Sequence, residues 1–88
     1  MGVVIKGFLR CGEKDAAIVR DAVGEHIRLS RAEPGCEHFE ITETEPGVFS
    51  ISERFVDQAA FEAHTQRTRA SEWWTRTRHI PRDIEIQS

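Results

Sequence analysis

The sequence contains no tyrosine, only two cysteines and no long hydrophobic run. Because tyrosine is absent, any mechanism that needs a phenol side chain from the protein is excluded. Cys11 and Cys36 are too few for a disulfide framework and lack the CxxC spacing of a zinc site, so we expect two free thiols. Lys6 and Arg10 interrupt the N-terminal apolar run, which is too short for a membrane-spanning helix or a secretory signal. We therefore expect a cytoplasmic protein that binds no membrane.

The charge balance argues against nucleic acid as a partner. The 12 basic and 15 acidic residues give a net charge of -3, which creates no field that would attract a phosphate backbone. The sequence also has neither a glycine-rich phosphate loop nor a nucleophile elbow, so we expect no nucleotide-dependent chemistry. Its 88 residues suffice for a single domain, residues 1–88, near the lower size limit of independent stability. Association with a second subunit would therefore be unsurprising.

The spacing of the apolar residues predicts strands and helices in a fixed order. Apolar residues alternate with polar ones in the strands and recur every three or four positions in the helices. Pro34 and Gly35 should end the first helix, and Asp57 should cap the second by accepting hydrogen bonds from free backbone amides. The predicted elements are a strand over 3–11, a helix over 14–32, a hairpin of strands over 36–44 and 48–55, a helix from the Asp57 cap to Arg69, a short helical piece over 70–79 and a strand over 82–88.

This order predicts an α+β fold with ferredoxin-like βαββαβ topology. The first two strands are joined by a helix and must cross over right-handedly, which leaves a slot that the third strand fills as the hairpin partner of the second. The result is one antiparallel sheet with the helices on one face. The opposite face carries Phe8, His38 and Ser50 and would stay open in a monomer.

Glu53 and His64 are the first candidate functional pair. Glu53 shares a strand face with Phe49, Ile51 and Phe55, and His64 lies on the inner stripe of the following helix. If that helix folds back over the sheet, the two side chains come within hydrogen-bond reach. A carboxylate that orients an imidazole is a general-base arrangement. The alternative is a buried hydrogen-bonded pair that only holds the helix to the strand.

The stretches EPGCEHFEI and FSISERFVDQAAFEAH resemble the antibiotic biosynthesis monooxygenase family, especially its quinol monooxygenase-like branch. The resemblance implies a dimeric α+β barrel, in which two sheets pack face to face as a homodimer and each subunit keeps a small apolar pocket. It covers positions 34 to 64. The matching residues are Pro34, Gly35, Cys36, Phe39, Glu53, Phe55, Asp57, Ala60 and His64.

Several positions depart from the family pattern. The family often has tryptophan where this chain has Phe55, and a second histidine where this chain has Arg69. The haem-degrading branch usually carries tryptophan in place of His64 and an asparagine on the first strand, and this sequence contains no asparagine. The resemblance therefore disfavours haem degradation.

By resemblance we expect a cofactor-independent monooxygenase that oxidises a small aromatic quinol, phenol or polyketide-like substrate with dioxygen, without a metal. A non-catalytic binding module for a small molecule, or an isomerase that uses His64 as acid and base, are the alternatives. The expected catalytic residues are His64 and Glu53. The expected substrate-binding residues are Phe39, Phe55, Phe61, Arg69, Trp73 and Trp74.

The two adjacent tryptophans cannot both point inward from one helix face. We expect one of Trp73 and Trp74 to cover the pocket and stack on an aromatic ligand, and the other to pack on the surface or the partner subunit. Plain core and dimer packing of both is the alternative. Arg69 could meet an anionic group of the substrate or lie on the surface. The remaining histidines, His26, His38 and His79, are expected to be structural or exposed.

Overall fold

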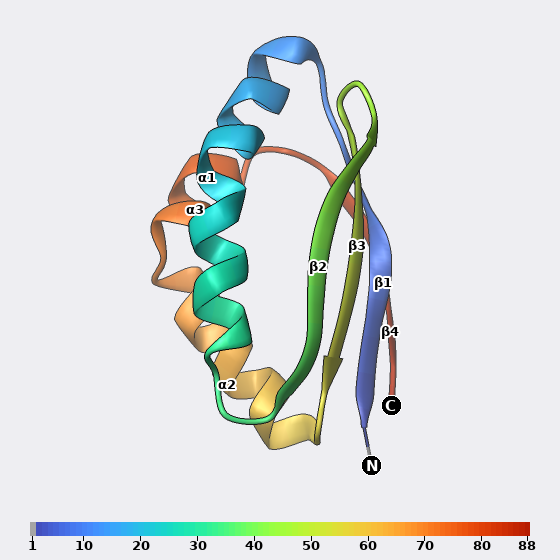
Figure 1. Ribbon diagram of the computed structural model, residues 1–88, viewed down its shortest axis with the longest axis vertical. Helices are drawn as coiled ribbons and strands as arrows, with labels where there is room; N and C mark the ends of the chain where they lie inside the picture. The colour runs from blue at the N-terminus through green and yellow to red at the C-terminus, as the bar shows by residue number, and fades with distance from the viewer. Residues whose placement is uncertain (1) are drawn as a thin grey trace.

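The computed structural model describes residues 2–88 and shows a four-stranded sheet with helices on one face (Figure 1). The elements, in chain order, are β1 (Val3–Arg10), α1 (Glu13–Arg31), β2 (Cys36–Glu45), β3 (Val48–Phe55), α2 (Gln58–Arg69), α3 (Glu72–Thr77) and β4 (Arg82–Gln87). The predicted order is confirmed. The predicted short helical piece is a separate helix, α3, because the Ser71 side chain accepts a hydrogen bond from the Trp74 amide and starts a new helix.

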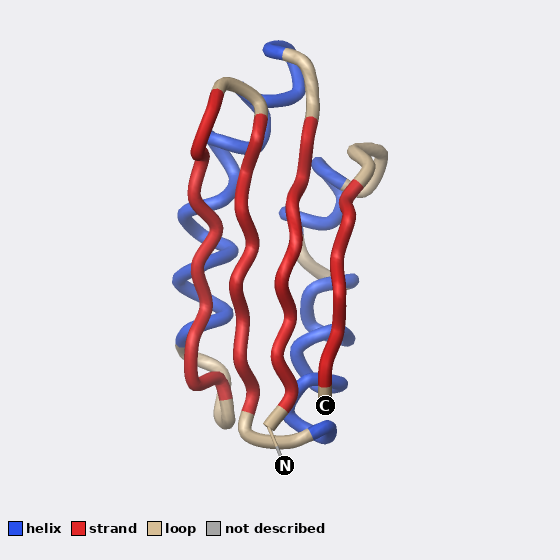
Figure 2. Tube along the Cα trace, turned by 90° about the vertical axis from the view of Figure 1, so that its right-hand side faces the viewer, coloured by secondary structure: helices blue, strands red, loops and turns tan. Residues whose placement is uncertain are grey.

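The sheet has the strand order β2-β3-β1-β4, and every neighbouring pair is antiparallel. Strand β3 thus fills the slot between β1 and β2, as the ferredoxin-like topology requires (Figure 2). The register places Ile5 of β1 opposite Glu53 on one side and opposite Ile86 on the other. These three residues form one row across the sheet.

The core lies between the sheet and the helices. Alternate strand residues face the helices, so Ile5 and Leu9 of β1 pack with Phe39 of β2 and Phe55 of β3, all almost completely buried. Helix α1 is amphipathic and contributes the buried Val19 to this layer. Burial of each of these large side chains favours folding by roughly 1.5–3 kcal/mol.

The turn after α1 brings its end against the start of α2. Gly35 has a φ of +87°, which glycine adopts at little cost, and a Cβ there would lie 2.7 Å from the Cβ of Ala60 and 2.9 Å from Cγ1 of Val56. The Val56 amide also donates a hydrogen bond to the Gly35 carbonyl at 2.8 Å. Glu33, two residues before Gly35, is thereby placed beside α2.

Asp57 caps α2 as predicted, since its side chain accepts a hydrogen bond from the Ala60 amide at 2.8 Å. His64 is the one fully buried residue of this helix. Phe61 and Thr68 of the same helix are partly buried and border a cavity.

The sheet face that points away from the helices is open in the single chain (Figures 1 and 2). Phe8 lies on it with 39% of its surface exposed, below the Arg10 guanidinium. Cys11 and Cys36 are free thiols, as expected. Within residues 2–88, no helix combines the length and the apolar character needed to cross a bilayer.

Candidate active site

A cavity of about 390 Å³ separates α2 and α3 from the sheet. Its sheet side is mainly aliphatic, and its helix side carries the aromatic and titratable groups. Ile84 and Ile86 of β4 line it and remain half exposed, so the cavity opens toward solvent near this edge strand. The lining residues are Ile5, His26, Ile41, Ile51, Glu53, Phe61, His64, Thr65, Thr68, Arg69, Trp73, Trp74, Arg82, Ile84 and Ile86.

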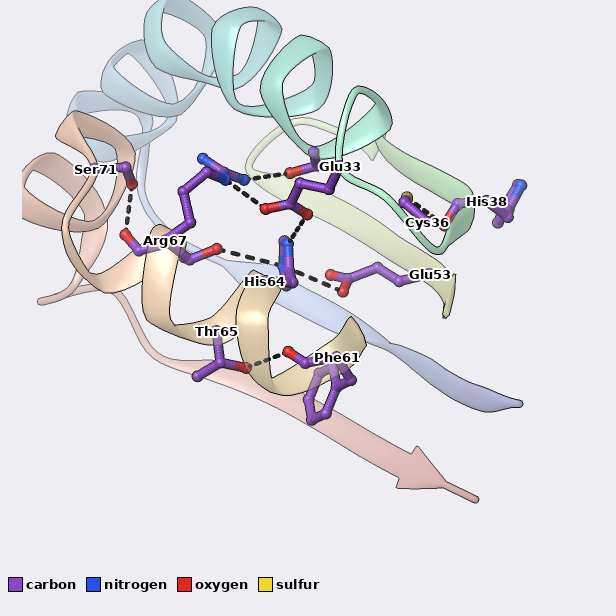
Figure 3. Close-up of polar contacts among 11 residues, drawn as sticks. Glu33, Cys36, His38, Glu53, Phe61, His64, Thr65, Arg67 and Ser71 are labelled. Carbon is purple, nitrogen blue, oxygen red and sulfur yellow. Dashed lines mark hydrogen bonds and ion pairs between the residues drawn. The ribbon is translucent and has the colours of Figure 1, made fainter. Parts of the chain in front are cut away.

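His64 is held at the cavity wall by contacts to both ring nitrogens (Figure 3). Its Nδ1 lies 2.7 Å from Oε1 of Glu33. Its Nε2 lies 3.3 Å from the hydroxyl of Thr68 and 3.7 Å from Oε1 of Glu53. Because an ionised carboxylate only accepts hydrogen bonds, Glu33 assigns the proton of the neutral ring to Nδ1. This leaves Nε2 as a proton acceptor beside Glu53.

Glu33 is itself fixed by Arg67, one turn of α2 beyond His64. The Arg67 Nε donates to Oε2 of Glu33 at 2.5 Å, and its Nη2 donates to the hydroxyl of Ser30 at 2.8 Å. The carboxylate of Glu33 therefore bridges a guanidinium and an imidazole (Figure 3). A carboxylate held in this way keeps the orientation of the ring and strengthens it as a base.

In place of the expected hydrogen bond with Glu53, the His64 ring donates one to Glu33. Glu53 does approach the ring, but its 3.7 Å distance from Nε2 exceeds that of a hydrogen bond. β3 and α2 are close enough for contact, but the shorter contact of the ring, 2.7 Å, is the one between Nδ1 and Glu33 at the end of α1. The prediction missed Glu33 because it follows the last turn of α1, far from His64 in sequence.

Burial shifts the pKa values of both Glu53 and His64. The pKa of Glu53 is raised to about 7, first by loss of water and then by the negative charge of Glu33. The pKa of His64 is lowered by burial, although the hydrogen bond that the ring donates to Glu33 opposes this. Near neutral pH the imidazole is therefore uncharged, and Glu53 exchanges between its acid and carboxylate forms.

We predict that Glu53→Gln stabilises the protein at pH 8 and changes its stability little at pH 5. A pKa raised in the folded state means that stability falls as pH rises from 4.5 to 7, where the folded chain holds a proton that the unfolded chain has lost. Glutamine resembles the protonated acid and removes this penalty, about 1–3 kcal/mol. Urea unfolding at both pH values measures it, and an equal effect at pH 5 and pH 8 would contradict the assignment.

The expected aromatic residues divide into two groups. Phe61, Trp73 and Trp74 line the cavity, together with Arg69. Phe39 and Phe55 do not line it, contrary to expectation. Both are almost completely buried between the sheet and the helices, and they pack on the His64 ring instead, with ring centroids 5.4 and 4.8 Å away. They support the imidazole rather than reaching the cavity.

Both tryptophans border the cavity, although only one was expected to do so. Trp73 is buried and stacks on His26, with centroids 4.8 Å apart and planes 3° from parallel. Trp74 is half-buried, and its ring centroid lies 5.5 Å from the guanidinium carbon of Arg82. The two neighbouring indoles do differ in depth, as expected for adjacent positions of one helix, but both reach the cavity.

Of the remaining histidines, His38 and His79 are exposed, as expected, whereas His26 is buried and also lines the cavity. His26 is buried, and burial lowers its pKa to about 3, helped by the positive charges around it. His38 is exposed and bonds the hydroxyl of Ser52 on the open sheet face, whereas His79 pairs with Asp15 at the surface. Over residues 2–88, no three side chains of the His, Cys, Asp and Glu types are grouped as metal ligands.

Comparisons with known proteins identify the family. Three solved structures share the fold, each with a TM-score of 0.84. Two carry the family name: one from Deinococcus radiodurans is 22% identical and the match covers 98% of this chain and 90% of that chain, and one from Nitrosomonas europaea is 18% identical with 99% and 88% covered. The third, a conserved Bacteroides thetaiotaomicron protein of unknown function described as a possible oxidoreductase, is 19% identical with 98% and 95% covered. No curated protein is significantly similar to this chain. The family model described as antibiotic biosynthesis monooxygenase matches residues 2–79. The chain therefore belongs to the antibiotic biosynthesis monooxygenase family.

Proposed function

We propose that the protein is a cofactor-independent monooxygenase of a small aromatic quinol or phenol. The observation that carries the proposal is the hydrogen bond that Nδ1 of His64 donates to Glu33, which leaves Nε2 unprotonated in the wall of an aromatic-rimmed cavity. Membership of the family agrees with this reaction. The cavity volume of about 390 Å³ suits a ligand of two or three rings.

In the proposed reaction, Nε2 of His64 accepts the phenolic proton and produces an electron-rich phenolate. The phenolate gives one electron to dioxygen, and the resulting radical and superoxide combine at a ring carbon to form a peroxide. Loss of the ring hydrogen from that carbon breaks the O–O bond. One oxygen atom stays in the product as a carbonyl, and the other leaves as water with the ring proton and the proton returned by His64. The substrate supplies all the electrons, so no external reductant is consumed.

The test is oxygen uptake by the purified protein with a panel of mono-, bi- and tricyclic hydroquinones and phenols. Substrate-dependent uptake at one O₂ per product, with oxygen from ¹⁸O₂ incorporated into the product, is the expected result. Formation of hydrogen peroxide without incorporation would indicate an oxidase. Tight binding of these compounds with no uptake would replace the proposal by the binding module that the same cavity could form.

We further propose that the protein is a homodimer joined through the open sheet face. The face carries the exposed Phe8 next to the polar Ser50, its cross-strand partner. An exposed apolar ring of this size on a mostly polar sheet face is a typical anchor for a protein contact. This arrangement leaves the cavity on the opposite side of the sheet in each subunit.

Phe8→Asp is therefore predicted to shift the protein from dimer to monomer and to lower its melting temperature at the same time. A buried carboxylate without a partner would oppose association across the sheet face. Sedimentation velocity and thermal unfolding measure the two effects. Val56→Asp is the matched control, because Val56 is also an exposed apolar residue but lies in the turn before α2. A monomeric wild type would contradict the proposed dimer.

A further inference from the structure

Arg82, at the start of β4, is a half-buried cation in the cavity wall with no acidic partner. Its Nη2 donates to the carbonyl and the hydroxyl of Thr77 at 2.5 and 3.0 Å, and its Nε donates to the carbonyl of Ile80 at 3.4 Å. These acceptors are all neutral. Among residues 2–88, no carboxylate lies within ion-pair distance of Arg82, and burial lowers the pKa of its guanidinium. A half-buried guanidinium without an acidic partner gains most from an anionic ligand.

Aromatic rings frame this guanidinium. Its carbon lies 5.8 Å from the Trp73 ring centroid and 5.5 Å from that of Trp74, within the range of cation–π contacts. Arg69 also lines the cavity, is exposed, and forms no ion pair with any described residue. The Arg82 end of the cavity is therefore positive and bordered by indoles, while Glu53 lies in a different row of the sheet.

The sheet register separates the two ends. Glu53 shares a row with Ile5 and Ile86, whereas Arg82 lies opposite Leu9, four residues farther along β1. Four residues of strand span roughly 13 Å. Because four is an even number, the Arg82 and Glu53 side chains point to the same face of the sheet. A ligand that contacts both ends must be extended, with different chemistry at each end.

We propose that the substrate is an aromatic carboxylate, whose carboxylate binds Arg82 and Arg69 while its phenolic hydroxyl lies at His64. The inference rests on the proposed function, since it names the class of molecule that the same site oxidises. The guanidinium groups offer charge-assisted, two-pronged hydrogen bonds to a carboxylate. Glu53 disfavours a second carboxylate at its own end, so charge sets the direction in which the ligand lies. The indoles and the aliphatic residues of β4, which line the cavity, would cover the faces of the ligand's aromatic ring.

The test compares two ligands of the same shape, 6-hydroxy-2-naphthoate and its neutral amide, by anaerobic calorimetric titration at pH 7. The wild type is expected to bind the acid at least about tenfold more tightly than the amide, the usual effect of one charged hydrogen bond. Added salt should weaken binding of the acid alone. Equal affinities, or no measurable binding of either ligand, would overturn the inference.

Substitutions of single arginines show which residue causes the preference for the acid over the amide. Arg82→Met should remove it while leaving the affinity for the amide within about threefold, and Arg69→Met should reduce it in part. Arg78→Met is the matched control, because Arg78 lies 5.9 Å from the Trp74 ring but does not line the cavity. If Arg82→Met unfolds, the ligand pair on the wild type and Arg69→Met still decide. A preference that survives both substitutions would contradict the assignment.

Oxygen uptake separates this inference from the proposed function. Tight binding of the acid without oxygen uptake from any phenol or quinol would leave the anion site standing and refute the oxygenase. Conversely, equal kcat/KM for acidic and neutral substrates of the same ring system would confirm the oxygenase and refute the anion site.

Discussion

Replacing His64 with glutamine is expected to lower kcat/KM for oxygenation by about 10²–10⁴-fold, the usual contribution of a general base. A glutamine amide can still donate to Glu33 and accept from Thr68, the two hydrogen bonds that hold the ring in place. The fold should therefore survive, and the loss should be one of proton transfer. Oxygen uptake with the best substrate of the panel measures it.

His38→Gln is the matched control for this substitution. His38 is exposed on the opposite face of the sheet, so its replacement should leave oxygen uptake unchanged. The affinity of the His64→Gln variant for a substrate analogue under anaerobic conditions should also stay within a few-fold of the wild type. A variant that keeps more than a tenth of the wild-type kcat/KM would show that another group removes the proton.

Arg67→Met is expected to destabilise the protein by about 2–3 kcal/mol, because it strips a buried carboxylate of its cation. The Glu33 side chain is only 15% exposed, and Arg67 is its charged partner. One nitrogen of Arg67, Nη1, is buried without a partner among residues 2–88, which places the expected loss below that of a fully satisfied pair. Urea unfolding of the wild type and the variant at pH 7 gives the change in the free energy of unfolding.

Two further variants test the origin of that loss. Arg69→Met changes an exposed arginine of the same helix that forms no ion pair with the described residues, so its effect should stay within about 0.5 kcal/mol. Adding Glu33→Gln to Arg67→Met should recover part of the stability, because no unpaired carboxylate remains. Equal losses from Arg67→Met and Arg69→Met would mean that the bridge to Glu33 contributes nothing.

The fold could be predicted from the sequence because its signals are local. Alternation along β1 and β3 shows which residues share a face, Asp57 marks the start of α2, and Pro34 with Gly35 marks the end of α1. Strand order then follows from the right-handed crossover and the hairpin. The period of a strand gives the face of a residue but not its depth. Phe39 and Phe55 were therefore placed on the correct face and expected to bind substrate, but they are buried and do not line the cavity.

The candidate site could be predicted only in part because its hydrogen bonds join distant segments. Glu53 and His64 were found together since adjacent elements carry them, and the structure places them at the same cavity. Glu33 and His64 are 31 residues apart, and their contact depends on how the turn at Gly35 docks the end of α1 on α2. One signal was available. Arg67 lies one helical turn after His64, on the same face, where a shared acidic partner was to be expected.

The position of the proton on His64 is the most direct test of the account, whose central claim is that Glu33 keeps Nε2 free to act as a base. Two-dimensional NMR that correlates the ring nitrogens with the ring carbon-bound protons reports it at pH 7. We predict a neutral ring with the proton on Nδ1 and an unprotonated Nε2, a state that Glu33→Gln should disturb. A ring protonated on Nε2, or charged at pH 7, would contradict the account.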